Sequence, residues 1–229
     1  MSNQKIQALS DNFCQGAVNT ALWGAATGTD GTSYPQAPIG SGNVSMTLSS
    51  PMGDGNSSLS ISEIMHVGTV DCLNQGVGTL AAYDLTNSGV SAQLVSMPSG
   101  AGPNIQATFI LSNNNGAAAN WLGWLIYYIG GSTGWVIDAV YGNPSLNWPN
   151  NSNPSQFSYN PAIHRNLRIV EHGGTVYWDY SPDGTTWTNA ASMADPFAVT
   201  GMYLSLYAST QTGTVPVQWG NVNYSLAIS

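Results

Sequence analysis

Hydrophobic and polar residues alternate along most of this chain, and the alternation has a period of two. A half-buried β-strand has this period because successive side chains point to opposite faces of a sheet. Apart from one helical turn expected at residues 19–23, no segment shows a helical period. The alternating segments are residues 43–49, 58–64, 79–85, 91–97, 105–112, 201–208 and 215–226.

The clearest signal is the segment LRIVEHGGTVYWDYSPDGTTWT, which reads as two hairpins in a row. The Gly173-Gly174 pair suits a two-residue turn, because glycine adopts positive φ at little cost. A turn at this pair fixes the register of the strands on either side. It places Arg168 opposite Asp179 and puts Trp178 on the apolar face.

The second turn of this segment is SPDG at residues 181–184. Its proline pre-sets φ and its glycine allows a left-handed residue. We expect a third strand that starts at Thr185 and carries Trp187. The three strands would form a β-meander with one apolar face.

Residues 121–129, WLGWLIYYI, carry large apolar side chains at both alternating sets of positions. Both faces of this strand should therefore be covered, which predicts a strand that is central in a sandwich. Residues 135–141 form the returning strand. Residues 142–161 contain four prolines and many asparagines and should form a long surface loop. No linker or repeat divides the chain, so residues 1–229 are expected to form one all-β domain, a sandwich or a barrel.

The composition excludes several functions. Charged residues make up 6% of the 229 residues, against ~25% in an ordinary soluble protein, and the net charge is −8. Three Lys plus Arg cannot form a basic surface, so we expect no nucleic-acid binding and little attraction to anionic membranes. No apolar run reaches the ~18 residues of a membrane span. Cys14 and Cys72 could form one disulfide or remain two buried thiols.

Several segments together resemble a known superfamily. LSDNF, NTALW, AAYDLTNSGVSAQL, the double hairpin, MYLSLYA and WGNVNYS are similar to the concanavalin A-like lectin/glucanase superfamily, whose fold is a jelly roll. More narrowly, they resemble laminin-G-like modules of actinobacterial surface proteins and of bacteriophage tail or capsid-surface proteins. The resemblance implies a two-sheet antiparallel β-sandwich. It leaves function open, because such modules bind glycans or proteins, decorate particles or act as glucanases.

The sequence lacks the acidic cluster of the glucanases that it resembles. Those enzymes carry Glu-x-Asp-x-(x)-Glu on one strand, whereas this chain has only Glu63 and Glu171. Glu171 lies beside a hairpin turn and is expected to be a solvated surface carboxylate. We therefore expect no enzymatic activity. His66, His164 and His172 do not have the spacing of a zinc site.

No cofactor is expected, although calcium would be the most plausible ion, because related modules often hold one through aspartates and loop carbonyls. The candidate ligands are Asp138, Asp183 and Asp195, which form no recognisable calcium loop.

Trp148 marks a candidate carbohydrate-binding site in the asparagine-rich loop. An aromatic ring can stack on a sugar face while amides bind its hydroxyls. The alternative is that Trp148 anchors the loop to the sandwich. The other candidate residues of this site are Asn147, Asn150, Asn151 and Tyr159.

These observations favour a non-enzymatic interaction module on a virion surface or in the extracellular space. The most concrete version is a bacteriophage tail or capsid-surface protein that binds host glycans or neighbouring virion proteins. The absence of an apolar export segment at the start of the sequence fits assembly inside a cell, or a truncated chain. The alternatives are a secreted bacterial carbohydrate-binding module or glucanase relative, and a decoration protein without a ligand that only oligomerises.

Overall fold

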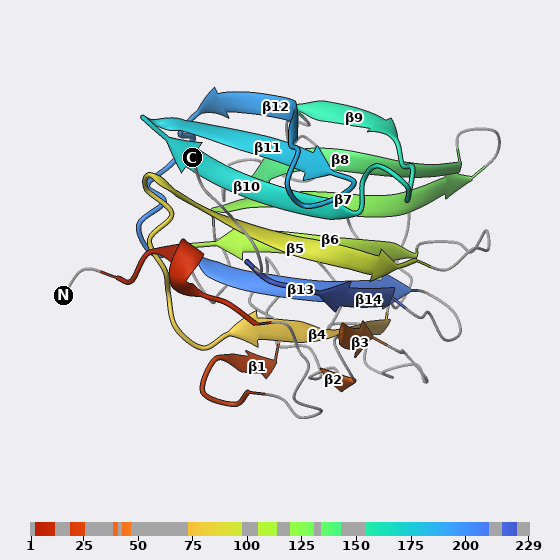
Figure 1. The fold of residues 1–229 in the computed structure, drawn as a ribbon, viewed down its shortest axis with the longest axis horizontal. Coiled ribbons are helices and arrows are strands. Elements are labelled where there is room, and N and C mark those ends of the chain that lie inside the picture. The colour runs from red at the N-terminus through yellow and green to blue at the C-terminus, as the bar shows by residue number, and fades with distance from the viewer. Residues whose placement is uncertain are drawn as a thin grey trace.

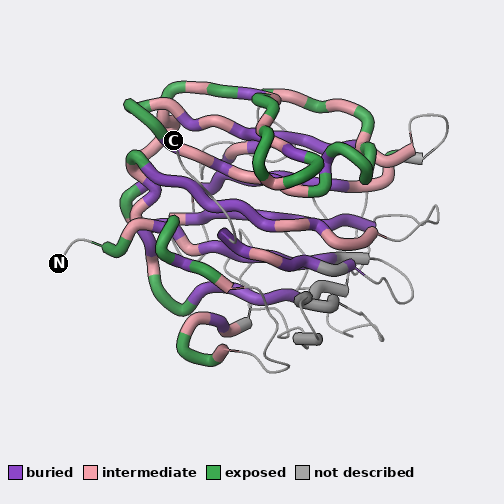
Figure 2. Tube along the Cα trace, in the orientation of Figure 1, coloured by how far each residue is buried: buried purple, intermediate pink, exposed green. Residues whose placement is uncertain are grey.

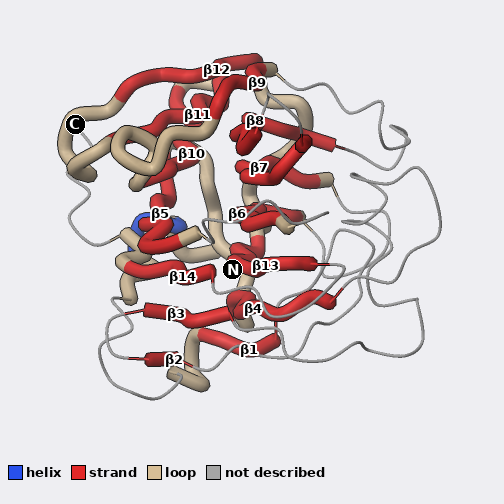
Figure 3. Tube along the Cα trace, turned by 90° about the vertical axis from the view of Figure 1, so that its right-hand side faces the viewer, coloured by secondary structure: helices blue, strands red, loops and turns tan. Residues whose placement is uncertain are grey.

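Two antiparallel sheets packed face to face form the protein (Figure 1). This computed structural model describes residues 3–11, 19–25, 39–40, 43–46, 73–97, 105–113, 120–130, 134–142, 154–210 and 217–223. The expected all-β, two-sheet sandwich is confirmed. Turned by 90°, the sheets appear as two stacks of strands (Figure 3).

The first sheet, here called the β7 sheet, has seven strands in the order β1-β4-β13-β6-β7-β8-β9. Alternation of apolar and polar residues predicts β6 and β13, and the apolar run at residues 121–129 and its return predict β7 and β8. As expected, β7 is an internal strand. Their bounds are β1 Trp23–Ala25, β4 Leu73–Thr79, β6 Gln106–Ser112, β7 Trp121–Gly130, β8 Gly134–Gly142, β9 Ser155–Ser158 and β13 Tyr203–Thr210.

The second sheet, here called the β10 sheet, also has seven strands, in the order β12-β11-β10-β5-β14-β3-β2. A short 3₁₀ helix, η1 (Ile6–Ala8), precedes both sheets in the chain and contacts β5. The strand bounds are β2 Ile39–Gly40, β3 Asn43–Met46, β5 Ser88–Ser96, β10 Asn166–His172, β11 Thr175–Ser181, β12 Thr188–Ala194 and β14 Val217–Gly220.

The β10–β11 hairpin has the register that its sequence predicts. Gly173 and Gly174 take φ of 61° and 79°. Arg168 is paired with Asp179, and the Arg168 Nε atom lies 2.8 Å from Asp179 Oδ2. Trp178 is fully buried, so the apolar face of the hairpin points into the sandwich.

The interior of the sandwich is apolar and is joined by aromatic side chains from both sheets. Phe109 of β6 and Trp219 of β14 meet edge to face, with ring centroids 6.5 Å apart. The Trp124 indole N–H donates to the Arg168 carbonyl oxygen at 3.1 Å, and the Trp178 indole N–H donates to the Gly123 carbonyl oxygen at 3.0 Å. Burial is nearly continuous along β5, β6 and β13 and decreases at the turns (Figure 2).

Three sequence predictions about strands are wrong. Strand β4 ends at Thr79, and the following residues form only isolated bridges, at Tyr83 and Asp84. The third strand of the meander begins at Thr188, so Trp187 precedes it and its ring lies 4.3 Å from the Arg168 guanidinium carbon. The expected loop at residues 142–161 contains β9. The predicted strand at residues 58–64 lies outside the described residues, as do Cys14 and Cys72.

Within the described residues, no helix is long and apolar enough to cross a membrane.

Candidate functional site

The outer face of the β7 sheet carries polar side chains in register across several strands. Trp124 and Phe109 point inward, so the adjacent residues in β7 and β6 point outward. Strand pairing aligns one outward residue from each of five neighbouring strands. This row consists of Tyr207 of β13, Thr108 of β6, Leu125 of β7, Asp138 of β8 and Gln156 of β9.

Asp138 lies at the centre of a hydrogen-bonded group on this face. Its Oδ2 atom accepts from the Tyr127 hydroxyl at 2.8 Å and from Gln156 Nε2 at 3.0 Å. Gln156 Nε2 also lies 2.8 Å from the Tyr127 hydroxyl oxygen. A carboxylate, a phenol and an amide from three neighbouring strands therefore converge within hydrogen-bonding distance.

Burial changes the protonation of both acidic groups. The Asp138 side chain is almost fully buried, and desolvation raises its pKa to about 6 despite the hydrogen bonds from Tyr127 and Gln156. Desolvation, and then the Asp138 charge, raise the pKa of the Tyr127 hydroxyl. Asp138 therefore exchanges a proton in mildly acidic solution, where an ordinary aspartate is fully ionised.

Two further polar residues extend this group along β6. Gln106 is paired with Tyr127, and its Nε2 atom donates to Thr108 Oγ1 at 3.2 Å. Both β6 side chains are fully buried, and the Gln106 Oε1 atom has no hydrogen-bond partner among the residues that the structure describes. A buried carbonyl oxygen without a partner is costly, so it is a place where a hydroxyl group would be stabilised. We call Gln106, Thr108, Tyr127, Asp138 and Gln156 the outer-face cluster.

The outer-face cluster reaches solvent at the β9 edge. Gln156 is exposed, as is Ser158 two residues further along the same strand, and Tyr127 is half-buried. The amide of Gln156 therefore lies between bulk solvent and the buried Asp138 carboxyl group. Its carbonyl oxygen accepts no hydrogen bond from the part of the chain that the structure describes and can bind an external donor.

Of the five residues expected to bind carbohydrate, only Tyr159 lies in the described part of the chain. It belongs to an aromatic group at the β9 edge of the sandwich, with its ring centroid 5.9 Å from that of His164. Burial raises the pKa of its hydroxyl to about 12. Tyr159 therefore packs against the core. The other four candidate residues, Asn147, Trp148, Asn150 and Asn151, lie outside the described residues.

The three aspartates considered for calcium lie in different parts of the fold. Asp138 is on the outer face of the β7 sheet, Asp183 is in the turn after β11, and Asp195 follows β12. Among the described residues, no three His, Cys, Asp or Glu side chains are close enough together to hold a metal ion.

Glu171 is buried, so the prediction that it is a solvated surface carboxylate is wrong. Its side chain is 1% exposed and accepts hydrogen bonds from the backbone N–H of Asn87 and, at 2.6 Å, of Gly174. The carboxylate thereby holds two turns together. Desolvation raises the pKa of Asp195, and the negative charge of Glu171 raises it further.

The outer-face cluster was missed at the sequence level because its residues lie on four different strands. The pairing of β7 with β8, which places Leu125 opposite Asp138, puts Tyr127 and Asp138 on the same face. Only the sheet order β6-β7-β8-β9 reveals that Gln106 and Gln156 join them. The one signal available was a carboxylate within an otherwise apolar strand, WVIDAVY.

The comparisons with solved structures identify the fold. A laminarinase from Flavobacterium sp. UMI-01 aligns with a TM-score of 0.60 and 7% identity over 93% of this chain and 97% of the other. The Crh5 transglycosylase in complex with NAG aligns at 0.59 and 12% identity over 97% and 86%. The chain has the concanavalin A-like lectin/glucanase fold. The carbohydrate recognition domain of Emp47p aligns at 0.54 and 10% identity over 93% and 94% of the two chains.

No family model and no curated protein matches the sequence. The structural neighbours contradict the expectation that this chain is not an enzyme. A laminarinase and a transglycosylase share its fold over nearly the whole chain, so the missing Glu-x-Asp-x-(x)-Glu cluster does not justify that conclusion.

Proposed function

We propose that this protein binds a glycan at the outer-face cluster, through the open β9 edge of the β7 sheet. The observation that carries the proposal is the convergence of Asp138, Tyr127 and Gln156, with an exposed amide above a buried carboxyl group. Sugar hydroxyls both donate and accept hydrogen bonds, and this cluster offers both kinds of partner. The glycan-related names of the three neighbours support the same class of ligand.

Binding of laminarin and N-acetylglucosamine oligosaccharides, measured by isothermal titration calorimetry, tests this proposal. Gln156→Ala is expected to weaken binding about tenfold, the effect of losing one good hydrogen bond in a binding site. Ser158→Ala is the matched control, because Ser158 is exposed on the same strand and points to the same face. Equal affinities of the two variants would exclude this site, and no binding of either sugar would contradict the proposal.

A second candidate function is modification of the glycan, and the raised pKa of Asp138 favours it. General acids of glycosidases have carboxyl pKa values raised in this way, so that they hold a proton near the working pH. Asp138 would donate its proton to the leaving glycosidic oxygen as that C–O bond breaks. Water or a sugar hydroxyl would attack the anomeric carbon and release its own proton to solvent. Glycosidase mechanisms that use two carboxyl groups would need a second one beside Asp138. Among the described strand residues, Asp138 carries the only carboxyl group on this face.

The same oligosaccharides distinguish binding from turnover. If Asp138 is the proton donor, products form from laminarin oligosaccharides below about pH 6 and product formation declines above it, as the carboxyl group ionises. Asp138→Asn would abolish product formation while retaining binding. If the oligosaccharides bind but no product forms at any pH, glycan modification is excluded and glycan binding is the only function supported.

The biological location remains the sequence-based proposal of a virion surface or an extracellular environment. Its support is the resemblance to phage and actinobacterial surface modules. A secreted carbohydrate-binding or glucanase-like protein agrees better with the names of the structural neighbours.

A further inference from the structure

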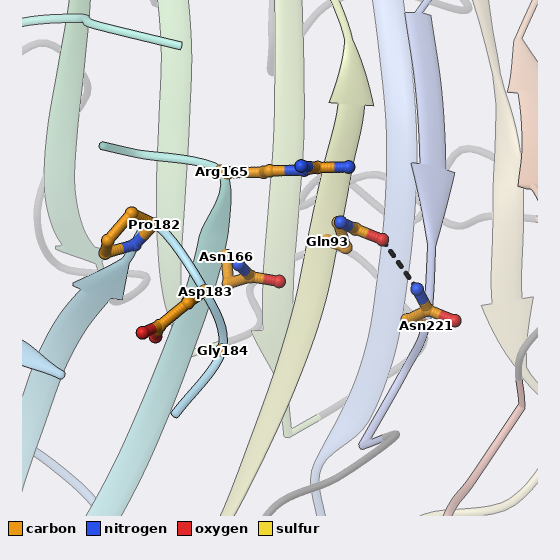
Figure 4. Close-up of a pocket in the computed structure, with 7 residues that line it drawn as sticks. All are labelled: Gln93, Arg165, Asn166, Pro182, Asp183, Gly184 and Asn221. Atoms are coloured by element: carbon orange, nitrogen blue, oxygen red, sulfur yellow. Dashed lines mark hydrogen bonds between the residues drawn. The ribbon is translucent and has the colours of Figure 1, made fainter. Parts of the chain in front are cut away.

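A second polar site lies on the opposite side of the sandwich, on the outer face of the β10 sheet. It is a pocket of about 230 Å³ between the beginning of β10, the turn after β11 and the segment after β14 (Figure 4). Gln93 and Asn166 are cross-strand partners on its floor. Its lining residues are Gln93, Arg165, Asn166, Pro182, Asp183, Gly184 and Asn221.

Arg165 is the feature of this pocket that requires an explanation. The chain has only three Lys and Arg residues. Lys5 is paired with Asp84 at 2.6 Å and Arg168 is paired with Asp179 at 2.8 Å. Arg165 is exposed and has no carboxylate partner among the described residues, although the chain as a whole is strongly acidic. A single unpaired guanidinium in a polar pocket is suited to an anionic ligand.

The Asp183 carboxylate at the pocket wall does not neutralise Arg165. Its Oδ1 atom accepts from the backbone N–H groups of Thr185 and Thr186, both at 2.8 Å, and from Ser181 Oγ at 2.9 Å. These hydrogen bonds hold the pKa of Asp183 well below its usual range. Figure 4 shows this carboxylate directed away from Arg165.

Neighbouring amides position the pocket and its cation. Asn166 Nδ2 donates to the Ser181 carbonyl oxygen at 3.2 Å, which fixes the β11–β12 turn above the pocket floor. In one orientation the Gln93 amide oxygen accepts from Asn221 Nδ2 at 2.6 Å, and in the other it accepts from Arg165 Nε at 2.9 Å. A neutral amide can orient the guanidinium in this way without cancelling its charge.

We propose that this pocket binds one carboxylated sugar unit, such as a uronic acid residue of a polysaccharide. Arg165 would bind the carboxylate through its planar guanidinium, and the amides of Asn166, Asn221 and Gln93 would bind hydroxyls. The volume is below the ~300–1,000 Å³ of sites for drug-sized ligands, which suits one sugar ring. A singly charged carboxylate meets less repulsion than a phosphate from the nearby Asp183 and from the net charge of −8. The proposal does not depend on the outer-face cluster.

Titration of the full chain with trigalacturonate, followed by NMR and calorimetry at low ionic strength, tests this inference. Backbone amide shifts are expected at Gln93, Arg165 and Asn221. Arg165→Gln should weaken binding at least tenfold, and Arg165→Lys should restore part of the loss. Ser158→Ala is the matched control and should bind trigalacturonate normally, because Ser158 is exposed on the opposite face and belongs to neither proposed site.

Four outcomes would overturn the proposal. Failure to bind trigalacturonate, or equal binding by wild type and Arg165→Gln, excludes a site at this pocket. Equal affinity for acetate would show that no sugar is recognised, and tighter binding of inorganic phosphate would exclude the choice of carboxylate. If a variant fails to fold, the backbone amide shifts of the wild-type protein still show whether trigalacturonate binds at this pocket. If the wild-type protein binds trigalacturonate but not laminarin, only the function proposed for the outer-face cluster is contradicted.

Discussion

At the scale of single residues, burial sets the chemistry of the ionisable groups in this fold. His164 is 2% exposed, and its ring lies against those of Phe157 and Tyr180, with centroids 5.0 and 4.6 Å away. Its Nδ1 atom accepts the backbone N–H of Asn160 at 2.9 Å, which requires that nitrogen to be unprotonated. Burial lowers the pKa of the imidazole to about 4. His164 is therefore a neutral part of the core.

His164 should make stability depend on pH. The unfolded chain binds a proton at this residue below pH 6.5, whereas the folded chain does so only near pH 4. The contribution of the neutral imidazole is therefore complete above pH 6.5 and is lost as the pH falls toward 4. The difference in free energy of unfolding between wild type and His164→Phe should fall by about 2 kcal/mol from about pH 7 to about pH 4.5.

Urea unfolding of the two proteins at both pH values measures this difference. Asp138 has a raised pKa and gives a dependence of opposite sign, but it is present in both proteins and cancels. A difference that stays constant with pH would contradict the assignment of His164 as a neutral core residue.

Residue identity alone could not reveal these environments. Asp138, His164 and Glu171 have little in common in the sequence, yet all three are nearly or fully buried in the fold. Alternation predicts which face of a strand a side chain occupies. It does not predict whether that face is covered, so the burial of Asp138 and Glu171 could not be anticipated.

At the scale of elements, hairpins with glycine turns were predictable and irregular segments were not. The β10–β11 register follows from the Gly173-Gly174 turn, because a two-residue loop allows one pairing. Strand β9 was missed because SQFS has only one apolar residue, Phe157, and lies in a proline-rich segment. Leu80 continued an apparent alternation but is 57% exposed, because the chain leaves the sheet there.

Strands β4 and β13 approach closely at Gly76, which provides a test at this scale. A Cβ atom at Gly76 would overlap Tyr207 Cβ and the Leu206 carbonyl oxygen. Gly76→Ala should therefore push the two strands apart and lower the free energy of unfolding by about 2 kcal/mol. Chemical denaturation measures the change.

Gly24→Ala is the matched control for this prediction, on the neighbouring strand β1. The added Cβ would lie 2.8 Å from Leu80 Cδ2, the end of a flexible and exposed side chain that can move aside. We expect a change within about 0.5 kcal/mol. Equal effects of the two substitutions would show that the spacing between β4 and β13 does not require glycine.

At the scale of the whole molecule, Asn223 joins segments from opposite ends of the sequence. Its Oδ1 atom accepts from the Ser91 backbone N–H at 2.9 Å. Its Nδ2 atom donates to the carbonyl oxygens of Ile6 at 2.9 Å and Leu9 at 2.6 Å. The 3₁₀ helix η1 is thereby fixed to β5. No short-range pattern could have predicted partners more than two hundred positions apart in the chain.

Removing this side chain should destabilise the fold as a whole. Asn223→Ala removes one hydrogen bond each from the Ser91 N–H and the Leu9 carbonyl oxygen, and leaves the Ile6 carbonyl oxygen with only its bond from the Leu9 N–H. About 3 kcal/mol of stability should be lost. Because Asn223 has φ of 50°, Asn223→Gly removes the same hydrogen bonds without backbone strain and isolates their contribution. Hydrogen exchange at Ile6 and Leu9 should accelerate in both variants. Unchanged exchange would contradict this role.

The two indole hydrogen bonds across the core, from Trp124 to Arg168 and from Trp178 to Gly123, run in opposite directions between the layers. Shear of one layer past the other would break both bonds and leave indole N–H groups in an oily environment. The two sheets should therefore move as one rigid body, and large-scale motion should be confined to the turns and the edge strands. Ligands would then meet surfaces whose shape is already set before contact, with little entropy lost by the scaffold on association.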